Sequence, residues 1–153
     1  MKVHEIMQRK IVMIPVGTVY SEVMDALLKH EISGAPVVDE QGKLVGIVSE
    51  KDLLRILYPY YESYYLNPEQ YTNHEDREKK ALDIRTRRVE EFMSRDVLTV
   101  NPDMPIMRAG SIMLSRGVHR LPVVQEGLLV GIITRRDLYK KLMEINYGDI
   151  LVT

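Results

Sequence analysis

The chain carries two copies of one sequence pattern, and this internal repeat constrains its fold more than any other feature. The copies are related by an offset of 86 positions, which falls to 85 after one residue is lost in a glycine-containing turn. The matching segments are Val3–Arg9 with Val89–Arg95, Pro36–Val38 with Pro122–Val124, Leu44–Ser49 with Leu129–Thr134, and Asp52-Leu53 with Asp137-Leu138. Two copies fill the 153 residues. The pattern therefore predicts a pair of similar supersecondary units rather than a long solenoid.

Each copy reads in the order β-α-β-β-α. A short β-rich segment comes first, Ile11–Ile14 in the first copy and Val97–Val100 in the second. A helix follows, starting near a good N-cap (Thr18; Asp103), with apolar residues at helical spacing (Val23, Ala26, Leu27; Ala109, Ile112, Met113). Two apolar runs then predict a hairpin, and a second helix begins at Ser49 or Thr134. The predicted fold class is α/β of the α+β type, with a small sheet in each half.

A segment of different composition separates the two copies. The predicted organisation is residues 1–57 for the first repeat, 58–87 for a Tyr-rich and charged insert, 88–145 for the second repeat and 146–153 for a tail. Six of the nine tyrosines lie in the insert, whose composition favours helix. The tyrosines fit an amphipathic surface covering the neighbouring unit, or a subunit or partner contact. The acidic residues around them disfavour a platform for stacking bases.

Composition excludes several classes of function. The 21 Lys and Arg residues balance 22 Asp and Glu residues, so the excess of positive charge typical of non-specific nucleic-acid binding is missing. The absence of Cys excludes disulfides, thiolate metal sites and Cys nucleophiles, and it fits a cytoplasmic location. No apolar run reaches membrane-spanning length, and no membrane segment is expected. The four histidines lack metal-ligand spacing, so no metal site is expected.

The most informative motif joins a strand to a helix in both copies. It reads Gly46-Ile47-Val48-Ser49-Glu50-Lys51-Asp52 in the first copy and Gly131-Ile132-Ile133-Thr134-Arg135-Arg136-Asp137 in the second. A hydroxyl residue followed three positions later by Asp is typical of a helix capping box, which needs no ligand. The same groups at a helix N-terminus can also bind a ribose diol and a phosphate. The glycine would let another backbone, or a flat base, approach closely.

In their order, duplication and spacing, these motifs resemble a pair of cystathionine-β-synthase (CBS) domains, also called a Bateman module. The resemblance covers the chain except for the Tyr-rich insert and the last few residues. It implies two CBS repeats packed about a pseudo-twofold axis, with clefts that bind AMP, ADP, ATP or S-adenosylmethionine. The family has no catalytic residues of its own and regulates an attached or separate protein. The resemblance therefore implies a regulatory adenosine ligand and no catalytic cofactor.

The resemblance also assigns residues to the two clefts. Ribose binding would fall to the hydroxyl and carboxylate of each motif: Ser49, Asp52, Thr134 and Asp137. The adenine would lie against the first strand and the strand that enters the proline, near Val12, Ile14, Ala35 and Pro36 in one copy and near Leu98, Val100, Leu121 and Pro122 in the other. Both copies keep the hydroxyl and the Asp, so two sites are implied.

The two copies differ in charge around the motif. The second copy has His119-Arg120 and Arg135-Arg136 where the first has Ser33-Gly34 and Glu50-Lys51. In relatives the phosphates point toward the shared axis. The resemblance thus implies phosphate binding by His119, Arg120 and Arg136 for the Asp52 nucleotide, and by Lys51 for the Asp137 nucleotide. One strong and one weaker phosphate site are expected. A lone His before a strand is equally well explained as a hydrogen-bonded boundary residue.

Three functions follow from these observations. The first is a stand-alone sensor of adenosine compounds that regulates a partner protein in trans. The second is a scaffold or oligomerisation protein whose clefts are vestigial. The third, an enzyme, has little support because the sequence offers no nucleophile–base pair, phosphate-binding glycine loop or paired catalytic carboxylates. CBS pairs usually dimerise through their helices into a flat disc, so a homodimer is expected.

Overall fold

The computed structural model describes residues 1–57, 79 and 82–147 and divides the chain into two compact units. Val12–Val97 form one unit, named here the Asp52 unit after its motif carboxylate. Met1–Ile11 and the chain from Leu98 onward form the other, the Asp137 unit. The six tyrosines of the predicted insert and the end of the tail, residues 148–153, lie outside the described residues.

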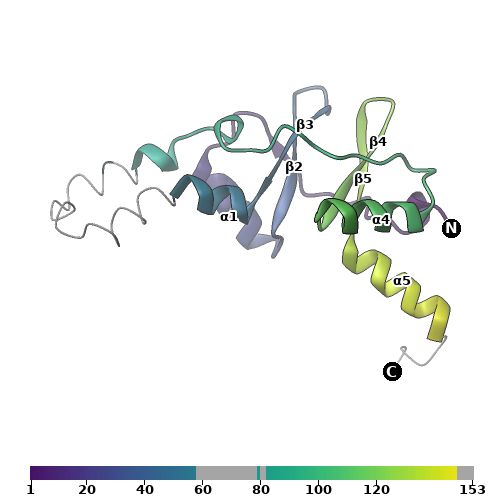
Figure 1. Cartoon of the computed structure of the whole chain (residues 1–153). Coiled ribbons are helices and arrows are strands. Elements are labelled where there is room, and N and C mark those ends of the chain that lie inside the picture. The colour runs from purple at the N-terminus through teal and green to yellow at the C-terminus, as the bar shows by residue number, and fades with distance from the viewer. Residues whose placement is uncertain (58–78, 80–81, 148–153) are drawn as a thin grey trace. The chain divides into compact units, whose positions relative to one another are not determined.

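The Asp52 unit is built on a small mixed sheet. Its elements are β1 (Ile14–Pro15), α1 (Tyr20–Lys29), β2 (Gly34–Val38), β3 (Leu44–Ser49), a helix over residues 50–57 and the 3-10 turn η3 (Val89–Glu91). β1 runs parallel to β2, and β2 and β3 form an antiparallel hairpin (Figure 1). β2 is buried along its whole length. One face of α1 completes the core through Tyr20, Val23 and Leu27.

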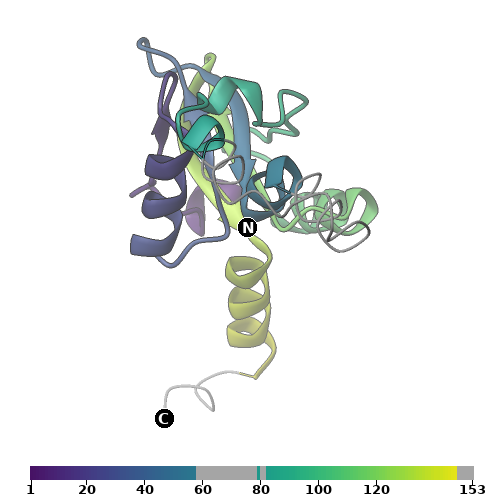
Figure 2. The ribbon, with the colours of Figure 1, turned by 90° about the vertical axis from the view of Figure 1, so that its left-hand side faces the viewer.

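The Asp137 unit repeats this plan with one strand reduced. Its elements are η1 (Val3–Glu5), α4 (Ile106–Arg116), β4 (Arg120–Gln125), β5 (Leu128–Thr134) and α5 (Arg135–Tyr147). β4 and β5 pair antiparallel, and α5 leaves the end of β5 (Figures 1 and 2). The first strand expected over Val97–Val100 is represented by a single parallel bridge between Val100 and Val123. The α+β class and the order of elements are confirmed, but both first strands are wrong in extent, since β1 begins only at Ile14, the last residue of the expected Ile11–Ile14 strand.

Both first helices start later than the sequence predicts, and neither uses the expected cap. The Thr18 hydroxyl donates to Pro15 O (2.7 Å), and α1 begins at Tyr20. Asp103 instead pairs with Lys2 (2.9 Å), whose hydrogen bond and positive charge lower the pKa of the Asp103 carboxyl. Backbone carbonyls take over the capping role, because Tyr20 N–H donates to Arg87 O and Ile106 N–H donates to Met1 O. The N-cap predictions at Thr18 and Asp103 are therefore wrong.

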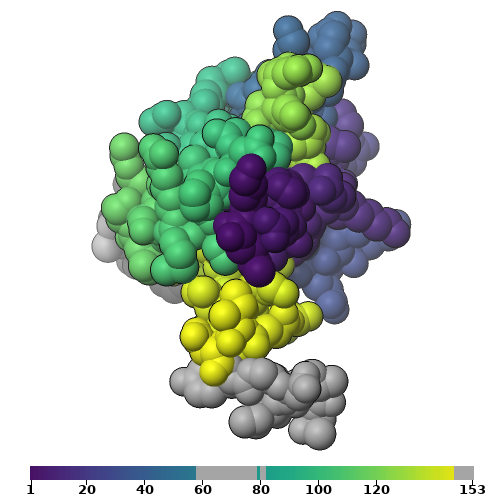
Figure 3. Space-filling view, turned by 90° about the vertical axis from the view of Figure 1, so that its right-hand side faces the viewer, coloured from purple at the N-terminus to yellow at the C-terminus, as the bar shows by residue number. Residues whose placement is uncertain are grey.

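The carbonyls that replace the caps belong to segments exchanged between the repeats. Val3 and Met7 lead the first repeat in sequence, yet their side chains lie in the hydrophobic core of the Asp137 unit. Val89 and Met93, their counterparts 86 positions later, lie in the core of the Asp52 unit. Figure 3 shows the first residues, in dark purple, packed against the green segment that leads into α4. Each compact unit is thus a repeat whose leading segment has been replaced by that of the other repeat.

The chain passes from one unit to the other at equivalent positions. The crossings fall between Ile11 and Val12 and between Val97 and Leu98, again 86 positions apart. Within the described residues, no helix is both long enough and apolar enough to cross a membrane.

Candidate functional site

The two copies of the motif form the same structure at the end of a strand. In the Asp52 unit, Ser49 ends β3 and the following helix begins at residue 50. In the Asp137 unit, Thr134 ends β5 and Arg135 begins α5. The motif Asp is therefore the third residue of each helix, the position from which a carboxylate can accept bonds from the first free backbone amides.

Each motif closes a reciprocal capping box. The Ser49 N–H donates to Asp52 Oδ2 (2.9 Å), and Asp52 N–H donates back to Ser49 Oγ (3.4 Å). The Thr134 N–H donates to Asp137 Oδ2 (2.8 Å), and Asp137 N–H donates to Thr134 Oγ1 (3.2 Å). Both hydroxyls also donate to the same oxygen Oδ2, at 3.1 and 2.7 Å. The capping interpretation of the motif is confirmed, and in each copy the cap uses Oδ2.

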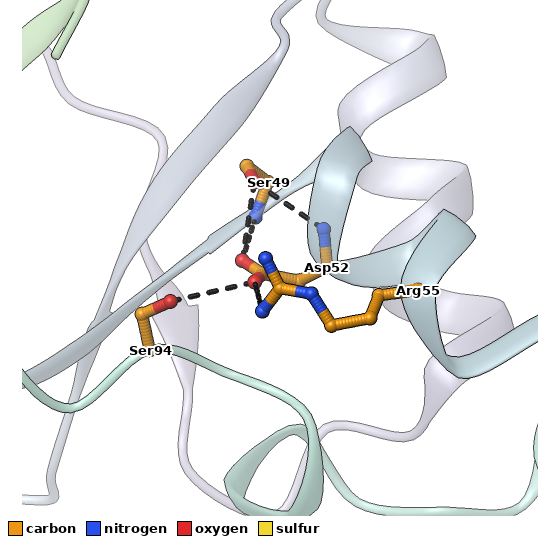
Figure 4. A network of polar contacts seen from close by, with 4 residues as sticks. All are labelled: Ser49, Asp52, Arg55 and Ser94. Atoms are coloured by element: carbon orange, nitrogen blue, oxygen red, sulfur yellow. Dashed lines mark hydrogen bonds and ion pairs between the residues drawn. The ribbon is translucent and has the colours of Figure 1, made fainter. Parts of the chain in front are cut away.

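The second oxygen of Asp52 has long contacts only. Figure 4 shows Ser94 and Arg55 converging on this carboxylate from a neighbouring loop and from the helix itself. Ser94 Oγ lies 3.4 Å from Oδ1, and Arg55 Nη1 lies 3.5 Å from it. The Asp52 side chain is 4% exposed, the only buried charged residue in the part of the chain that the structure describes. Because Arg55 is itself 65% exposed on its side chain, the ion pair is only partly shielded from solvent.

The second oxygen of Asp137 is held by a different group. The side-chain amide of Gln8 donates to Asp137 Oδ1 (3.0 Å) and lies 3.1 Å from Oδ2, so that it spans both carboxylate oxygens. Gln8 and Ser94 occupy equivalent places, each directly after the buried methionine of an exchanged leading segment. In both motifs the helix cap uses Oδ2 and the exchanged segment contacts Oδ1, and at Asp137 the Gln8 amide also reaches Oδ2.

The glycine of each motif makes room for that segment. Ile47 exchanges two backbone hydrogen bonds with Ser94 (2.8 and 2.9 Å), and Ile132 exchanges two with Gln8 (2.8 and 3.0 Å). A Cβ placed on Gly46, which precedes Ile47, would lie 2.6 Å from Met93 Sδ and 2.9 Å from Ser94 O. The close approach expected of this glycine is thus to another backbone.

Most residues predicted to pack against adenine lie in the protein cores. Fully or almost fully buried members of this set are Ile14, Ala35, Pro36, Val100, Leu121 and Pro122. Val12 and Leu98 are half-buried, and each directly follows a crossing point between the units. Side-chain contact with a base is therefore open to Val12 and Leu98, whereas the other six stabilise the sheets.

The basic residues of the second copy lie close to its own motif. Arg120 pairs with Thr134 in the β4–β5 ladder, and Arg135 N–H donates to His119 O (3.0 Å). The side chains of His119 and Arg136 are exposed, and so is Lys51 in the Asp52 unit. The Arg135 guanidinium, in contrast, donates to Val118 O (3.1 Å), two residues beyond α4, and lies 3.5 Å from Met113 O in the last turn of that helix. His119, Arg120 and Arg136 therefore all lie in the Asp137 unit. That they bind the phosphates of the nucleotide at Asp52 stays a prediction.

Three residues at the carboxylates were not found from the sequence. Gln8 and Ser94 had a visible signal, since they occupy equivalent positions after the Met of aligned segments, but nothing local links them to Asp137 and Asp52. Arg55 follows Asp52 by one helical turn, a spacing that permits an ion pair without requiring one. Over the described residues, no group of three or more His, Asp or Glu side chains is placed to hold a metal ion.

Comparison with known proteins matches the chain twice to one family. The family model of the CBS domain matches residues 3–59 and 89–144. The Methanocaldococcus jannaschii protein MJ1426 is 37% identical over 134 residues, which cover 80% of each chain. The A-adding tRNA nucleotidyltransferase of Aquifex aeolicus is 30% identical over 94% of this chain, yet the chain spans only 15% of that enzyme's length.

A solved structure supports the same assignment. The CBS domain pair of protein MJ0100, in complex with 5-methylthioadenosine and S-adenosyl-L-methionine, has a TM-score of 0.69 and 26% sequence identity. The alignment covers 93% of this chain and 95% of that one. Both repeats, the motif at each strand–helix junction and this shared fold lead to one conclusion: the chain belongs to the CBS-domain family, as a pair of CBS domains.

Proposed function

We propose that this protein is a regulatory module that binds adenosine-containing ligands and passes their presence to a partner protein. The observation that carries the proposal is the duplicated Ser/Thr-x-x-Asp junction, in which the helix cap uses Oδ2 and leaves Oδ1 to long or exchangeable contacts. The ligands of a similar domain pair, 5-methylthioadenosine and S-adenosyl-L-methionine, both carry an adenosine-type group. AMP, ADP and ATP share its ribose diol.

The chemistry of the carboxylates suits a ribose. A vicinal diol presents two O–H donors, and an ionised carboxylate is an acceptor on both oxygens. Hydrogen bonds to a charged acceptor are worth about 1.5–3 kcal/mol, more than those between neutral groups. Asp52 and Asp137 would therefore supply most of the ribose recognition, with Ser49 and Thr134 beside them. His119, Arg120, Arg136 and Lys51 would bind phosphates, and Val12 and Leu98 would contact the base.

We infer that the module acts as a homodimer. Large apolar side chains are exposed at equivalent positions of both repeats: Leu28 and Leu114 on the first helices, Leu54 and Tyr139 on the second. Repeated exposure at matched positions favours a symmetric contact. Sedimentation tests this inference, since a mass of twice 17.7 kDa is expected and a monomer at all concentrations would overturn it.

A second function, a scaffold without ligand binding, is favoured by one observation. Asp52 is almost fully buried and already has donors on both oxygens. A carboxylate in that state can serve as a structural cap alone. The two functions differ in what a ligand does to stability, because any ligand that binds only the folded state raises the free energy of unfolding.

The test is binding of AMP, ADP, ATP and S-adenosylmethionine, measured by calorimetry and by thermal melting. The wild-type protein, Asp52→Asn, Asp137→Asn and the double variant are compared. Asn keeps an acceptor oxygen for the helix cap but has only one, so the fold is retained and bidentate diol binding is lost. Each single variant is expected to lose one site, with affinity there lowered by about tenfold or more.

Asp39→Asn is the matched control. Its Oδ1 accepts bonds from Gln41 and Lys43 N–H (both 2.9 Å) in the turn between β2 and β3, so it is a structural Asp away from the motif. At 100 times Kd a ligand raises the stability of the wild type by about 2.7 kcal/mol. Unchanged melting with all four compounds would overturn the proposal and leave the scaffold function.

A further inference from the structure

The Gln8 side chain occupies the edge of Asp137 that a diol would use. Its amide nitrogen lies 3.0 Å from Oδ1 and 3.1 Å from Oδ2, so one donor group bridges both oxygens. Oδ2 already accepts the Thr134 N–H and hydroxyl at 2.8 and 2.7 Å. A carboxylate offers about two acceptor positions on each oxygen. A diol that binds this edge must therefore take the place of the Gln8 amide.

The side chain can leave while its segment stays in place. Gln8 is exposed to solvent, whereas Val3 and Met7 of the same segment are buried in the core. The Gln8 backbone is fixed by two hydrogen bonds to Ile132, at 2.8 and 3.0 Å. A change of side-chain rotamer would release Asp137 without breaking these contacts, since exposed side chains change rotamer on a picosecond to nanosecond scale.

The equivalent position in the other repeat carries no such competitor. Ser94 is too short to bridge a carboxylate, and its hydroxyl contacts only Oδ1 of Asp52, at 3.4 Å. Two sites with the same motif thus differ in the residue that follows the buried methionine of the exchanged segment.

We propose that Gln8 competes with the ribose diol for Asp137, and that the Gln8/Ser94 difference sets the relative affinity of the two sites. This inference rests on the proposed function. It adds a specificity-determining residue that touches the carboxylate but lies 129 positions away in sequence. The Asp137 site is the weaker one for this reason, independently of any difference in phosphate contacts.

The experiment isolates the Asp137 site in an Asp52→Asn background and measures AMP binding by calorimetry. Gln8→Ala is expected to raise AMP affinity by about threefold to tenfold, the fold-change that corresponds to one ordinary hydrogen bond after exchange with water. Binding of 2′-deoxy-AMP, which has no diol, is expected to change less than twofold. The reciprocal variant, Ser94→Gln in an Asp137→Asn background, is expected to lower AMP affinity at Asp52.

A second readout follows Gln8 directly. The side-chain NH2 resonances of Gln8 in a ¹⁵N-labelled full chain are expected to move toward free-amide positions when AMP binds. Unchanged or weakened AMP binding in Gln8→Ala, with its melting temperature retained, would overturn the inference and leave the proposed function intact. Absence of AMP binding in every variant would instead remove the proposed function, and the inference with it.

Discussion

The two first helices end in the same backbone conformation but with different residues. Gly117 directly follows α4 and has φ +65°, and the equivalent residue beyond the end of α1 is Glu31, with φ +52°. In both places the next amide donates back across the turn, Val118 to Met113 O and Ile32 to Leu27 O. A side chain in this left-handed region costs about 1–2 kcal/mol, which glycine avoids.

Opposite substitutions at these two residues should therefore have opposite effects. Gly117→Ala is expected to lower the free energy of unfolding by about 1 kcal/mol, because no atom lies near the new Cβ and only the backbone is strained. Glu31→Gly should raise it by about 0.5 kcal/mol, since relief of strain is partly offset by the greater freedom of glycine in the unfolded chain. Urea denaturation measures both. A loss of stability in Glu31→Gly would contradict this account.

The motif glycines offer a second test at residue scale. Both new Cβ atoms would meet a flexible methionine sulfur, Met93 Sδ at 2.6 Å from Gly46 and Met7 Sδ at 2.5 Å from Gly131. The backbone contact differs, because Ser94 O lies 2.9 Å from a Cβ on Gly46 and Gln8 O lies 3.2 Å from a Cβ on Gly131. Gly46→Ala is expected to cost about 3 kcal/mol, and Gly131→Ala about 1 kcal/mol. Replacing the contacting methionine by Ala, Met7 or Met93, should remove most of the penalty at Gly131 but only part of it at Gly46, where the contact with Ser94 O remains. Equal penalties in urea denaturation would show that the backbone of Ser94 moves freely.

At the scale of elements, each exchanged leading segment is expected to stabilise the unit of the other repeat, and not the repeat that follows it in sequence. Val3→Ala is expected to destabilise the Asp137 unit, and Val89→Ala the Asp52 unit, by about 2 kcal/mol each, because both side chains are fully buried. Hydrogen exchange locates the effect. Val3→Ala should accelerate exchange in α4 and β5, and Val89→Ala in α1 and β3.

The same two variants serve as controls for each other, since they replace equivalent residues. Faster exchange in β3 but not in β5 on Val3→Ala would show that each segment stabilises its own repeat instead.

Sequence patterns predict the elements that a local signal specifies and miss those that distant backbone decides. The hairpins, the helical faces of Val23 and Met113 and the capping boxes follow from periodicity and spacing, and all are present. The caps at Thr18 and Asp103 fail because carbonyls of the exchanged segments satisfy the same amides. Repeat alignment pairs Gln8 with Ser94 but cannot say which carboxylate each one contacts. That choice depends on where the chain crosses between units.

For the whole molecule, a net charge of −1 conceals a local conflict. α5 begins with Arg135 and Arg136, although cations are unfavourable near the positive end of a helix dipole. The Arg135 guanidinium is held by carbonyl oxygens at and just beyond the last turn of α4, those of Met113 and Val118. Arg136 is exposed, and a phosphate nearby would offset its charge. The equivalent Lys51 follows Glu50, an anion that the same dipole favours.

Arg136→Gln should therefore change stability and binding in opposite directions. Without ligand, the free energy of unfolding is expected to rise by about 0.3–0.5 kcal/mol, because a cation is removed from the helix N-terminus. Affinity for ATP is expected to fall about tenfold at low salt and less at 0.5 M salt, where screening weakens charge contacts, while adenosine affinity stays unchanged. Measured in the Asp52→Asn and Asp137→Asn backgrounds, the loss of ATP affinity also shows which of the two nucleotides Arg136 contacts.

Lys51→Gln is the matched control, and it is expected to change the free energy of unfolding without ligand less than Arg136→Gln does. A variant that lowers ATP and adenosine affinity equally would assign Arg136 to the fold rather than to a phosphate.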